Sequence, residues 1–333
     1  MQVDGVLWTE VLRDDRRGQC RHVVGASSGD VVEDLRRRGG TARGSALVAA
    51  HGREALERAV RGGEVLRLAR GAHGLRSAPP ALLAAGAASG VVSHAAAARL
   101  WLVDTLHQPT GVDVTVPRTA RRRPAVAGVR LHWSTLAPHD VQDGVTSPVR
   151  TVVDCARRLP FAESLGIADG FLRRGLVGAH ELRQVAETAR GPGRARLLRV
   201  ADAADGRSAN PFESALRAAV LEEGITSFVP QVTVVAGDHG PVRPDLLDVR
   251  RRIALEADSF AWHGSRAALA RDCRRYNALV LGGFLVLRFS WEQVVGDPAS
   301  AGRAVCAAVR LVDARELPRP DLHKRARSRI RGR

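Results

Sequence analysis

Several residue types that support particular structures are scarce in this chain. Of its 333 residues, four are cysteines, one is methionine and one is tyrosine. The cysteines are scattered without paired spacing, so the sequence predicts neither a disulfide framework nor a zinc site. No apolar run is long enough to cross a membrane, and the first thirty residues hold no apolar signal-peptide core. These absences predict a cytoplasmic protein with reduced thiols and no membrane partner.

Lysine is almost absent, because Lys324 is the only one and nearly every basic residue is arginine. Such a bias is typical of a GC-rich genome, so the number of arginines alone says little about function. The formal net charge is nonetheless +16, an excess that needs a polyanionic partner or a solvated surface. The segment from Lys324 to Arg333 holds six basic residues and predicts a tail that is either solvated or in contact with phosphates.

The length of the chain predicts two or three domains. The expected helices and strands predict a mixed α/β class, α+β overall. Glycine- and proline-containing breaks and changes of periodicity set the boundaries. We predict an N-terminal extension at 1–28, a winged helix-turn-helix at 29–78, a mixed middle region at 91–205, an α/β domain at 209–313 and a basic tail at 314–333.

Residues 29–78 show the element order of a winged helix-turn-helix. Periodic apolar positions predict a helix at Asp30–Arg38, a second helix capped by Thr41, and a third at Arg53–Arg61. Short strands at 65–68 and 73–75 flank Arg70-Gly71 and predict the wing. In this fold the third helix enters the major groove of DNA.

The stretch from Gly39-Gly40-Thr41 to Leu75 resembles the N-terminal winged-helix domain of AbiEi-type antitoxins. The resemblance implies binding to operator DNA and repression of a toxin-antitoxin operon. The DNA contacts that it implies are Arg43, Arg53, Arg58 and Arg70. Two other interpretations stay open: Arg53 and Arg58 form a solvated helix face, or the winged helix serves as a protein-interaction module.

Residues 91–205 combine strands and helices. Ser93 is placed to cap a helix that runs to Trp101, and alternation predicts strands at 112–116 and 129–133. From Pro148 onward the pattern predicts helices near 148–158, 161–174, 178–189 and 193–204. The arrangement resembles the segment after the winged helix in AbiEi-like proteins, which implies an antitoxin role and a toxin partner. We find no catalytic constellation here, and Asp154 with Cys155 fits a helix core with one satisfied polar group.

Beyond 205–209 the pattern predicts a layered α/β domain. The expected order is a helix at 211–223, strands at 229–235, near Asp245 and at 253–257, a helix at 265–281, a strand at 285–289 and a closing helix at 299–312. Asp245 ends one apolar run, while Glu256 and Asp258 end the next. Residues two apart in a strand share a face, so Glu256 and Asp258 point together toward Asp245. Ligands that are all oxygen atoms favour Mg²⁺ or Mn²⁺. In a basic protein, the commonest use of such an ion is to cut or bind a phosphodiester.

The same domain resembles the restriction-endonuclease-like PD-(D/E)xK superfamily, and within it the group related to very-short-patch-repair (Vsr) endonucleases. The residues that carry the likeness are Glu213, Pro244-Asp245, Glu256-Ala257-Asp258, His263-Gly264, Arg271-Asp272 and the run 286–291. By matching positions, the resemblance implies Asp245 and Glu256 as metal ligands and Glu213 as an accessory acid.

One departure from the superfamily pattern concerns its lysine, because Asp258 stands where that lysine is expected. Vsr-like relatives also depart from the lysine pattern, and the likeness to them implies His263 as the general acid or base. The reaction implied is metal-assisted hydrolysis of a phosphodiester. The arginines expected to hold phosphate oxygens are Arg271, Arg274 and Arg275.

Structural explanations exist for most of these residues. Asn210-Pro211 and Glu213 form a capping-box pattern, so Glu213 caps its helix, serves as an accessory acid, or does both. Asp245 fits a turn after a proline, and His263 fits a loop closure beside Gly264. Glu256 is harder to explain, because an unpaired carboxylate in a buried strand is costly.

Asp272 fits a salt bridge to Arg275, one helical turn away.

Three functions stay open. The first is a DNA-binding protein that cuts or nicks DNA with Mg²⁺ in a defence or toxin-antitoxin setting. The second is a non-catalytic repressor and antitoxin with the nuclease fold as a scaffold, which the missing lysine favours. The third is a metal-dependent hydrolase of RNA or nucleotides.

Overall fold

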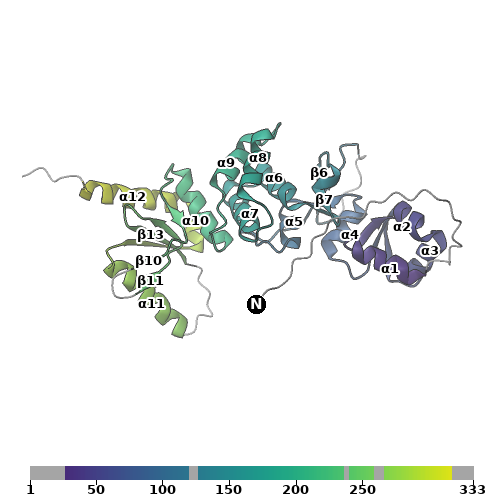
Figure 1. Ribbon diagram of the computed structural model, residues 1–333, viewed down its shortest axis with the longest axis horizontal. Coiled ribbons are helices and arrows are strands. Elements are labelled where there is room, and N and C mark those ends of the chain that lie inside the picture. The colour runs from purple at the N-terminus through teal and green to yellow at the C-terminus, as the bar shows by residue number, and fades with distance from the viewer. Residues whose placement is uncertain (1–26, 120–126, 236–239, 259–265, 317–333) are drawn as a thin grey trace, which may run out of the picture.

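The computed structural model describes residues 27–119, 127–235, 240–258 and 266–316. They form the mixture of helices and small sheets expected from the sequence, arranged as an elongated molecule (Figure 1). The N-terminal helices lie at one end, the C-terminal sheet and its helices lie at the other, and helices α5 to α9 lie between them. In these described ranges, no helix is both long enough and apolar enough to span a membrane.

The N-terminal region has the element order helix, strand, helix, helix and hairpin. Its elements are α1 (Ser28–Arg37), β1 (Thr41–Arg43), α2 (Gly44–His51), α3 (Arg53–Arg61), β2 (Val65–Ala69) and β3 (Ala72–Leu75). Ser27 and Asp30 form a capping box that starts α1. The expectation that Thr41 caps the second helix is wrong, because Thr41 pairs with Gly74 in the three-stranded sheet β1-β3-β2. Buried Val31, Leu35 and Leu47 join the helices to this sheet.

The first half of the middle region is built around a five-stranded sheet of order β6-β5-β4-β8-β7. Its elements are α4 (Pro80–Ala87), β4 (Val91–Val92), α5 (His94–Leu100), β5 (Val112–Val116), β6 (Val129–Trp133), the 3-10 turn η1 (Pro138–Asp140), β7 (Val141–Gln142) and β8 (Val145–Thr146). Ser93 is the N-cap residue of α5, yet its hydroxyl does not cap the backbone and instead bonds the Nδ1 atom of His94, 2.8 Å away.

Four helices follow within one or two residues of their expected bounds. They are α6 (Pro148–Arg158), α7 (Phe161–Arg173), α8 (Ala179–Thr188) and α9 (Arg194–Ala203). Phe171, Leu182 and Leu197 are fully buried where these helices meet. The burial of this apolar face explains why helical periodicity located the four helices.

The C-terminal region is a four-stranded sheet of order β14-β13-β12-β9 between layers of helices. Its elements are α10 (Pro211–Glu222), β9 (Val229–Pro230), β10 (Val234–Val235), β11 (Pro241–Val242), β12 (Leu246–Asp248), β13 (Ile253–Asp258), α11 (Arg266–Leu281), β14 (Leu285–Ser290), the π-turn η3 (Glu292–Gly296) and α12 (Pro298–Glu316). The strand expected at 229–235 is divided in two, because Gln231 adopts a left-handed backbone with φ of 56°.

Alternate residues of β13 face different helices. Leu255 belongs to the core with Phe212 of α10 and Val305 of α12, whereas Ala254 belongs to the core with Leu279 of α11. Because side chains alternate along a strand, Glu256 and Asp258 lie on the α11 face of the sheet, together, as predicted.

Helices α7 and α10 join the middle and C-terminal regions. The carboxylate of Asp169 in α7 is fully buried and accepts bonds from Arg217 NH2 at 2.6 Å, Ser214 Oγ at 2.7 Å and the Asp205 amide at 2.7 Å. A Cβ on Gly166 of α7 would lie 3.3 Å from Pro211 Cβ, so the two helices approach closely at this glycine. The expected boundary at 205–209 is therefore crossed by buried polar contacts.

Candidate functional site

The register of β12 and β13 brings two of the predicted acids together. Leu246 pairs with Leu255 in this antiparallel register, so Asp245 lies next to Glu256 of β13. Asp245 Oδ2 accepts the backbone amide of Ala257 at 2.8 Å. The Asp245 carboxylate is therefore fixed at the strand end, next to Glu256, as the sequence predicts.

Asn210 rather than Glu213 caps α10, because its Oδ1 accepts the backbone amides of Phe212 and Glu213. Glu213 bonds the two residues that precede the helix and also reaches this acidic pair. Its Oε2 accepts the Ala209 amide at 2.7 Å, and its Oε1 accepts the side-chain amide of Asn210 at 2.9 Å. The amide of Gln231 donates to Glu213 Oε2 at 2.9 Å and to Asp245 Oδ1 at 3.3 Å. Gln231 thus links the two acids, a role that nothing in the sequence pattern indicates.

Glu256 is the least satisfied acid of the group. It is 3% exposed, and neither of its side-chain oxygens accepts a hydrogen bond. The Nη2 atom of Arg275 lies 3.0 Å from Oε2, which makes an ion pair without hydrogen-bond alignment. Burial, with the adjacent charge of Asp245, raises the pKa of Glu256 to about 8. Burial likewise raises the pKa of Asp245 and of Glu213.

Two arginines face these carboxylates. Arg288 of β14 stands opposite Glu256 in the parallel register and pairs through Nε with Asp258 Oδ2 at 2.5 Å. The sequence offered a signal for this residue, because Arg288 interrupts an otherwise apolar strand. The expected salt bridge of Asp272 with Arg275 is wrong, since Arg275 instead pairs with Glu256.

Of the other three predicted residues of this site, the structure describes the side chain of one, Arg274. Arg274 is exposed on α11 and makes no ion pair or hydrogen bond within the described ranges. Arg271 belongs to α11, but its side chain lies outside the description. His263 lies outside the described residues altogether.

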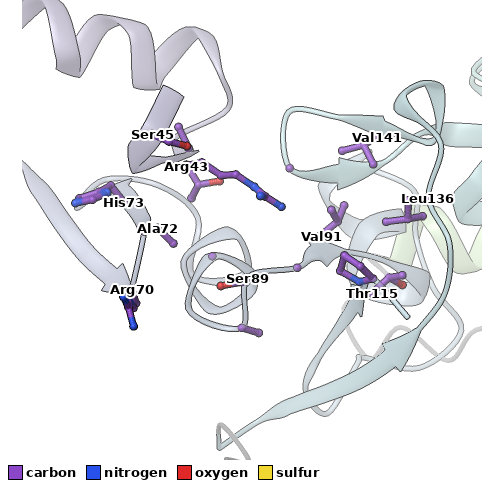
Figure 2. Close-up of a pocket in the computed structure, with 18 of the residues that line it drawn as sticks. Arg43, Ser45, Arg70, Ala72, His73, Ser89, Val91, Thr115, Leu136 and Val141 are labelled. Atoms are coloured by element: carbon purple, nitrogen blue, oxygen red, sulfur yellow. The ribbon is translucent and has the colours of Figure 1, made fainter. Parts of the chain in front are cut away.

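The predicted DNA-contacting arginines divide into two groups. Arg43 and Arg70 line a pocket of about 760 Å³ between the N-terminal three-stranded sheet and the adjoining five-stranded sheet, and Arg43 extends into it from β1 (Figure 2). Arg53 and Arg58 belong to the exposed face of α3, where Arg58 lies 3.8 Å from Glu54. Because exposed Glu57 lies on the same helix, the face carries both signs of charge.

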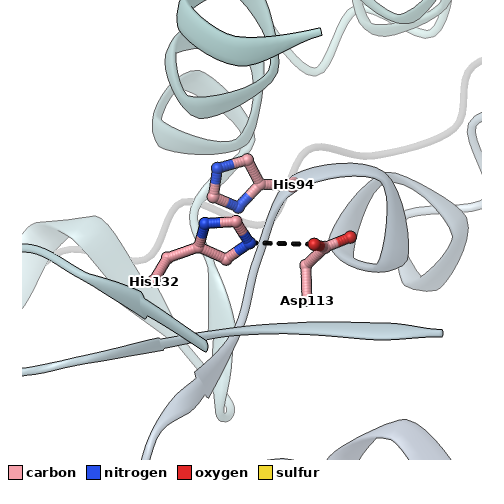
Figure 3. A group of neighbouring side chains, drawn as sticks. All are labelled: His94, Asp113 and His132. Carbon is pink, nitrogen blue, oxygen red and sulfur yellow. Dashed lines mark hydrogen bonds and ion pairs between the residues drawn. The ribbon is translucent and has the colours of Figure 1, made fainter. Parts of the chain in front are cut away.

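A second polar cluster lies in the middle region, where sequence reasoning found no constellation. His94, Asp113 and His132 bring ligand-type atoms within 4.8 Å of one another (Figure 3), the one such three-residue set in the part of the chain described. Nε2 of His132 lies 2.8 Å from Asp113 Oδ1, and the rings of His94 and His132 stack with centroids 4.0 Å apart. Polar residues inside two short strands were the available signal for this cluster.

Asp154, expected to be satisfied, is only half satisfied. Its Oδ1 accepts from Arg150 Nε at 2.9 Å, whereas its buried Oδ2 has no partner. Burial raises the pKa of this carboxyl. Cys155 beside it is fully buried, as expected of a core thiol.

Comparison with known proteins assigns no activity to the chain. No family model matches it. The uncharacterized proteins MT2308, of Mycobacterium tuberculosis strain CDC 1551 / Oshkosh, and Rv2248, of strain ATCC 25618 / H37Rv, are each 27% identical to it over 198 residues. The match covers 58% of this chain and 71% of each of those proteins.

Proposed function

We propose that the C-terminal domain hydrolyses phosphodiester bonds with a divalent ion, Mg²⁺ or Mn²⁺, held by Asp245 and Glu256. The observation that carries the proposal is the pair of buried, unbonded oxygens of Glu256 beside a second buried carboxylate. A buried acid without a partner is costly unless a ligand compensates it. Carboxylate oxygens are the ligands that Mg²⁺ and Mn²⁺ prefer.

The surrounding residues suit work on a phosphate. Asp245, fixed by the Ala257 amide, and Glu256 present oxygens from adjacent strands. A bound divalent ion would supply a water of lowered pKa and would neutralise phosphate charge. Arg275 lies beside the acids and would orient a phosphate oxygen, as would Arg274 on the exposed face of α11. His263 is proposed, from its sequence position alone, to move the proton.

The proposed substrate is DNA, with the winged helix as the module that binds it. The order α1, β1, α2, α3 and hairpin supports this assignment, together with the net charge of +16. In the Vsr-like and AbiEi-like interpretation the setting is defence or toxin-antitoxin control.

A plasmid assay tests the hydrolysis. Full-length protein with Mg²⁺ or Mn²⁺ is expected to convert supercoiled DNA to open-circle or linear forms, and EDTA is expected to stop it. Glu256→Gln and Asp245→Asn should each lower the rate by more than about 100-fold, since the loss of supporting groups around a metal already costs 10–100-fold. Glu187→Gln, a substitution of an exposed acid on α8, is the matched control. The proposal would be contradicted if the plasmid stayed intact, or if Glu256→Gln cleaved it as fast as the wild type does.

A second candidate is a non-catalytic repressor and antitoxin, and the ion pairs favour it. Arg275 and Arg288 already neutralise Glu256 and Asp258, the latter at the position of the expected lysine. This function predicts sequence-specific binding to the protein's own promoter, weakened by Arg53→Ala or Arg58→Ala. The logarithm of the binding constant should fall by about 0.9 per neutralised phosphate for each unit of the logarithm of salt concentration. No shift of promoter DNA at moderate salt would contradict it.

A further inference from the structure

A pocket in the middle region has five arginines in its wall. Its volume is about 560 Å³, and helices α5, α6 and α9 and strand β6 contribute to its wall. We call it the arginine pocket; its wall includes His94, His132, Arg118, Arg157, Arg158 and Arg196. It lies outside the carboxylate site of β12 and β13 and is independent of the proposed function.

Three of these arginines are exposed and unpaired. Across the described ranges, Arg118, Arg158 and Arg196 make no hydrogen bond or ion pair. Of the nearby acids, Asp113 is bound by Arg130 through both carboxylate oxygens, at 3.0 and 3.1 Å. Asp154 is bound by Arg150 through one oxygen, and its other oxygen has no hydrogen-bond partner. In the described wall of the pocket, five arginines therefore face one acid, Asp154.

The N-terminus of α9 adds to this charge. Gly193 is its N-cap, no side chain caps the helix, and its first turn holds no acid. Gly193 has φ of 79°, and a Cβ there would lie 2.9 Å from Arg157 Cβ and from its carbonyl oxygen, so glycine is required. Amides at such a helix end point outward and favour an anion.

His94 supplies an independent sign of a ligand. It is 4% exposed, and its backbone is held in the left-handed region with φ of 52°. Its Nδ1 bonds the buried hydroxyl of Ser93, which leaves Nε2 without a partner in the described structure. Burial lowers the pKa of His94 to about 3, so the ring is neutral near pH 7. When the Ser93 hydroxyl donates to Nδ1, the proton of the neutral ring lies on Nε2, and Nε2 donates to a ligand.

A divalent cation is the competing ligand for His94, Asp113 and His132. Two observations oppose it: the Asp113 carboxylate is occupied by Arg130, and the surrounding arginines repel a cation. An anion meets neither obstacle.

We propose that the arginine pocket binds the phosphate monoester of a phosphorylated ligand. Arg158 and Arg196 pair with the phosphate oxygens, the N-terminus of α9 faces it, and His94 donates from the floor of the pocket. The monoester belongs either to a free nucleotide or to the 5′ end of a nucleic-acid strand, and the two sources share this chemistry.

Calorimetry on the full-length protein in EDTA tests the proposal with AMP, adenosine and inorganic phosphate. AMP is expected to bind and adenosine is not. The double variant Arg158→Ala/Arg196→Ala should lower the affinity for AMP at least about tenfold. The control is Arg174→Ala, which removes an exposed arginine outside the pocket that has no ion pair with any residue the structure describes, and it should bind as wild type.

Two oligonucleotides of one sequence, with and without a 5′ phosphate, distinguish the sources. A preference of at least about tenfold for the phosphorylated strand, lost in the double variant, would assign the pocket to strand ends. AMP binding without that preference would assign it to free nucleotides. The proposal is overturned if the double variant binds both AMP and the phosphorylated strand as tightly as the wild type does. It is also overturned if the protein binds Zn²⁺ and His94→Ala abolishes that binding.

Discussion

Two buried carboxylates in this protein lie next to arginine and differ in how they are satisfied. Asp169, where α7 meets α10, accepts hydrogen bonds from Arg217, Ser214 and the Asp205 amide. Glu256 on β13 is about equally buried, yet its oxygens accept no hydrogen bond and Arg275 is its one ion-pair partner within the described residues. A fully bonded buried acid stabilises the architecture, whereas an unbonded one keeps its oxygens free for a ligand.

The largest expected effect concerns the satisfied acid. Asp169→Ala leaves Arg217 buried without its partner and should lower the free energy of unfolding by about 3–5 kcal/mol. Urea denaturation measures this loss, which should not depend on Mg²⁺. Asp202→Ala, which breaks the exposed pair with Arg183, is the control and should cost less than about 1 kcal/mol. Equal losses in the two variants would remove the structural role of Asp169.

The unsatisfied acid predicts a pH dependence. The pKa of Glu256 is near 4.5 when unfolded and about 8 when folded, so between these values the folded state binds more protons. The free energy of unfolding should therefore fall as pH rises from 4.5 to 8, on the order of 2–4 kcal/mol in EDTA. Glu256→Gln should remove most of this slope. If chemical denaturation gave the same dependence of the free energy of unfolding on pH for both proteins, that result would contradict a raised pKa at Glu256.

The smallest effect is expected at the bridge between the acids. Gln231→Ala removes the donor shared by Glu213 and Asp245 and should cost about 1 kcal/mol of stability. Gln184→Ala, an exposed glutamine on α8, should cost nothing measurable and serves as the control. A loss as large as that of Asp169→Ala would show that Gln231 belongs to the architecture rather than to the site.

Periodic segments were predictable from the sequence and irregular ones were not. The helices from Pro148 to Ala203 bury one face each, so their apolar spacing located them. Helix α4, of sequence PALLAAGA, is apolar all round and has no period to detect. Strand β1 is three residues long, and the bend at Gln231 depends on a backbone conformation that the sequence does not signal.

The two sites differ in the same way. Asp245 directly precedes the apolar strand β12, and Glu256 follows the apolar residues of the neighbouring strand β13, so their proximity followed from strand geometry. The cluster of His94, Asp113 and His132 draws on three separate elements, and no spacing along the chain relates them. The partners Arg275 and Arg288 depend on how α11 and β14 pack, which is a property of the folded sheet.

Manganese binding tests the central claim, that Asp245 and Glu256 share a divalent ion. Electron paramagnetic resonance at pH 8.5, above the pKa of Glu256, measures free Mn²⁺ as protein is added. The wild type and Glu187→Gln should each bind Mn²⁺, and Asp245→Asn and Glu256→Gln should each bind it at least about tenfold more weakly. No uptake by the wild type, or uptake that neither acid variant weakens, would contradict the claim.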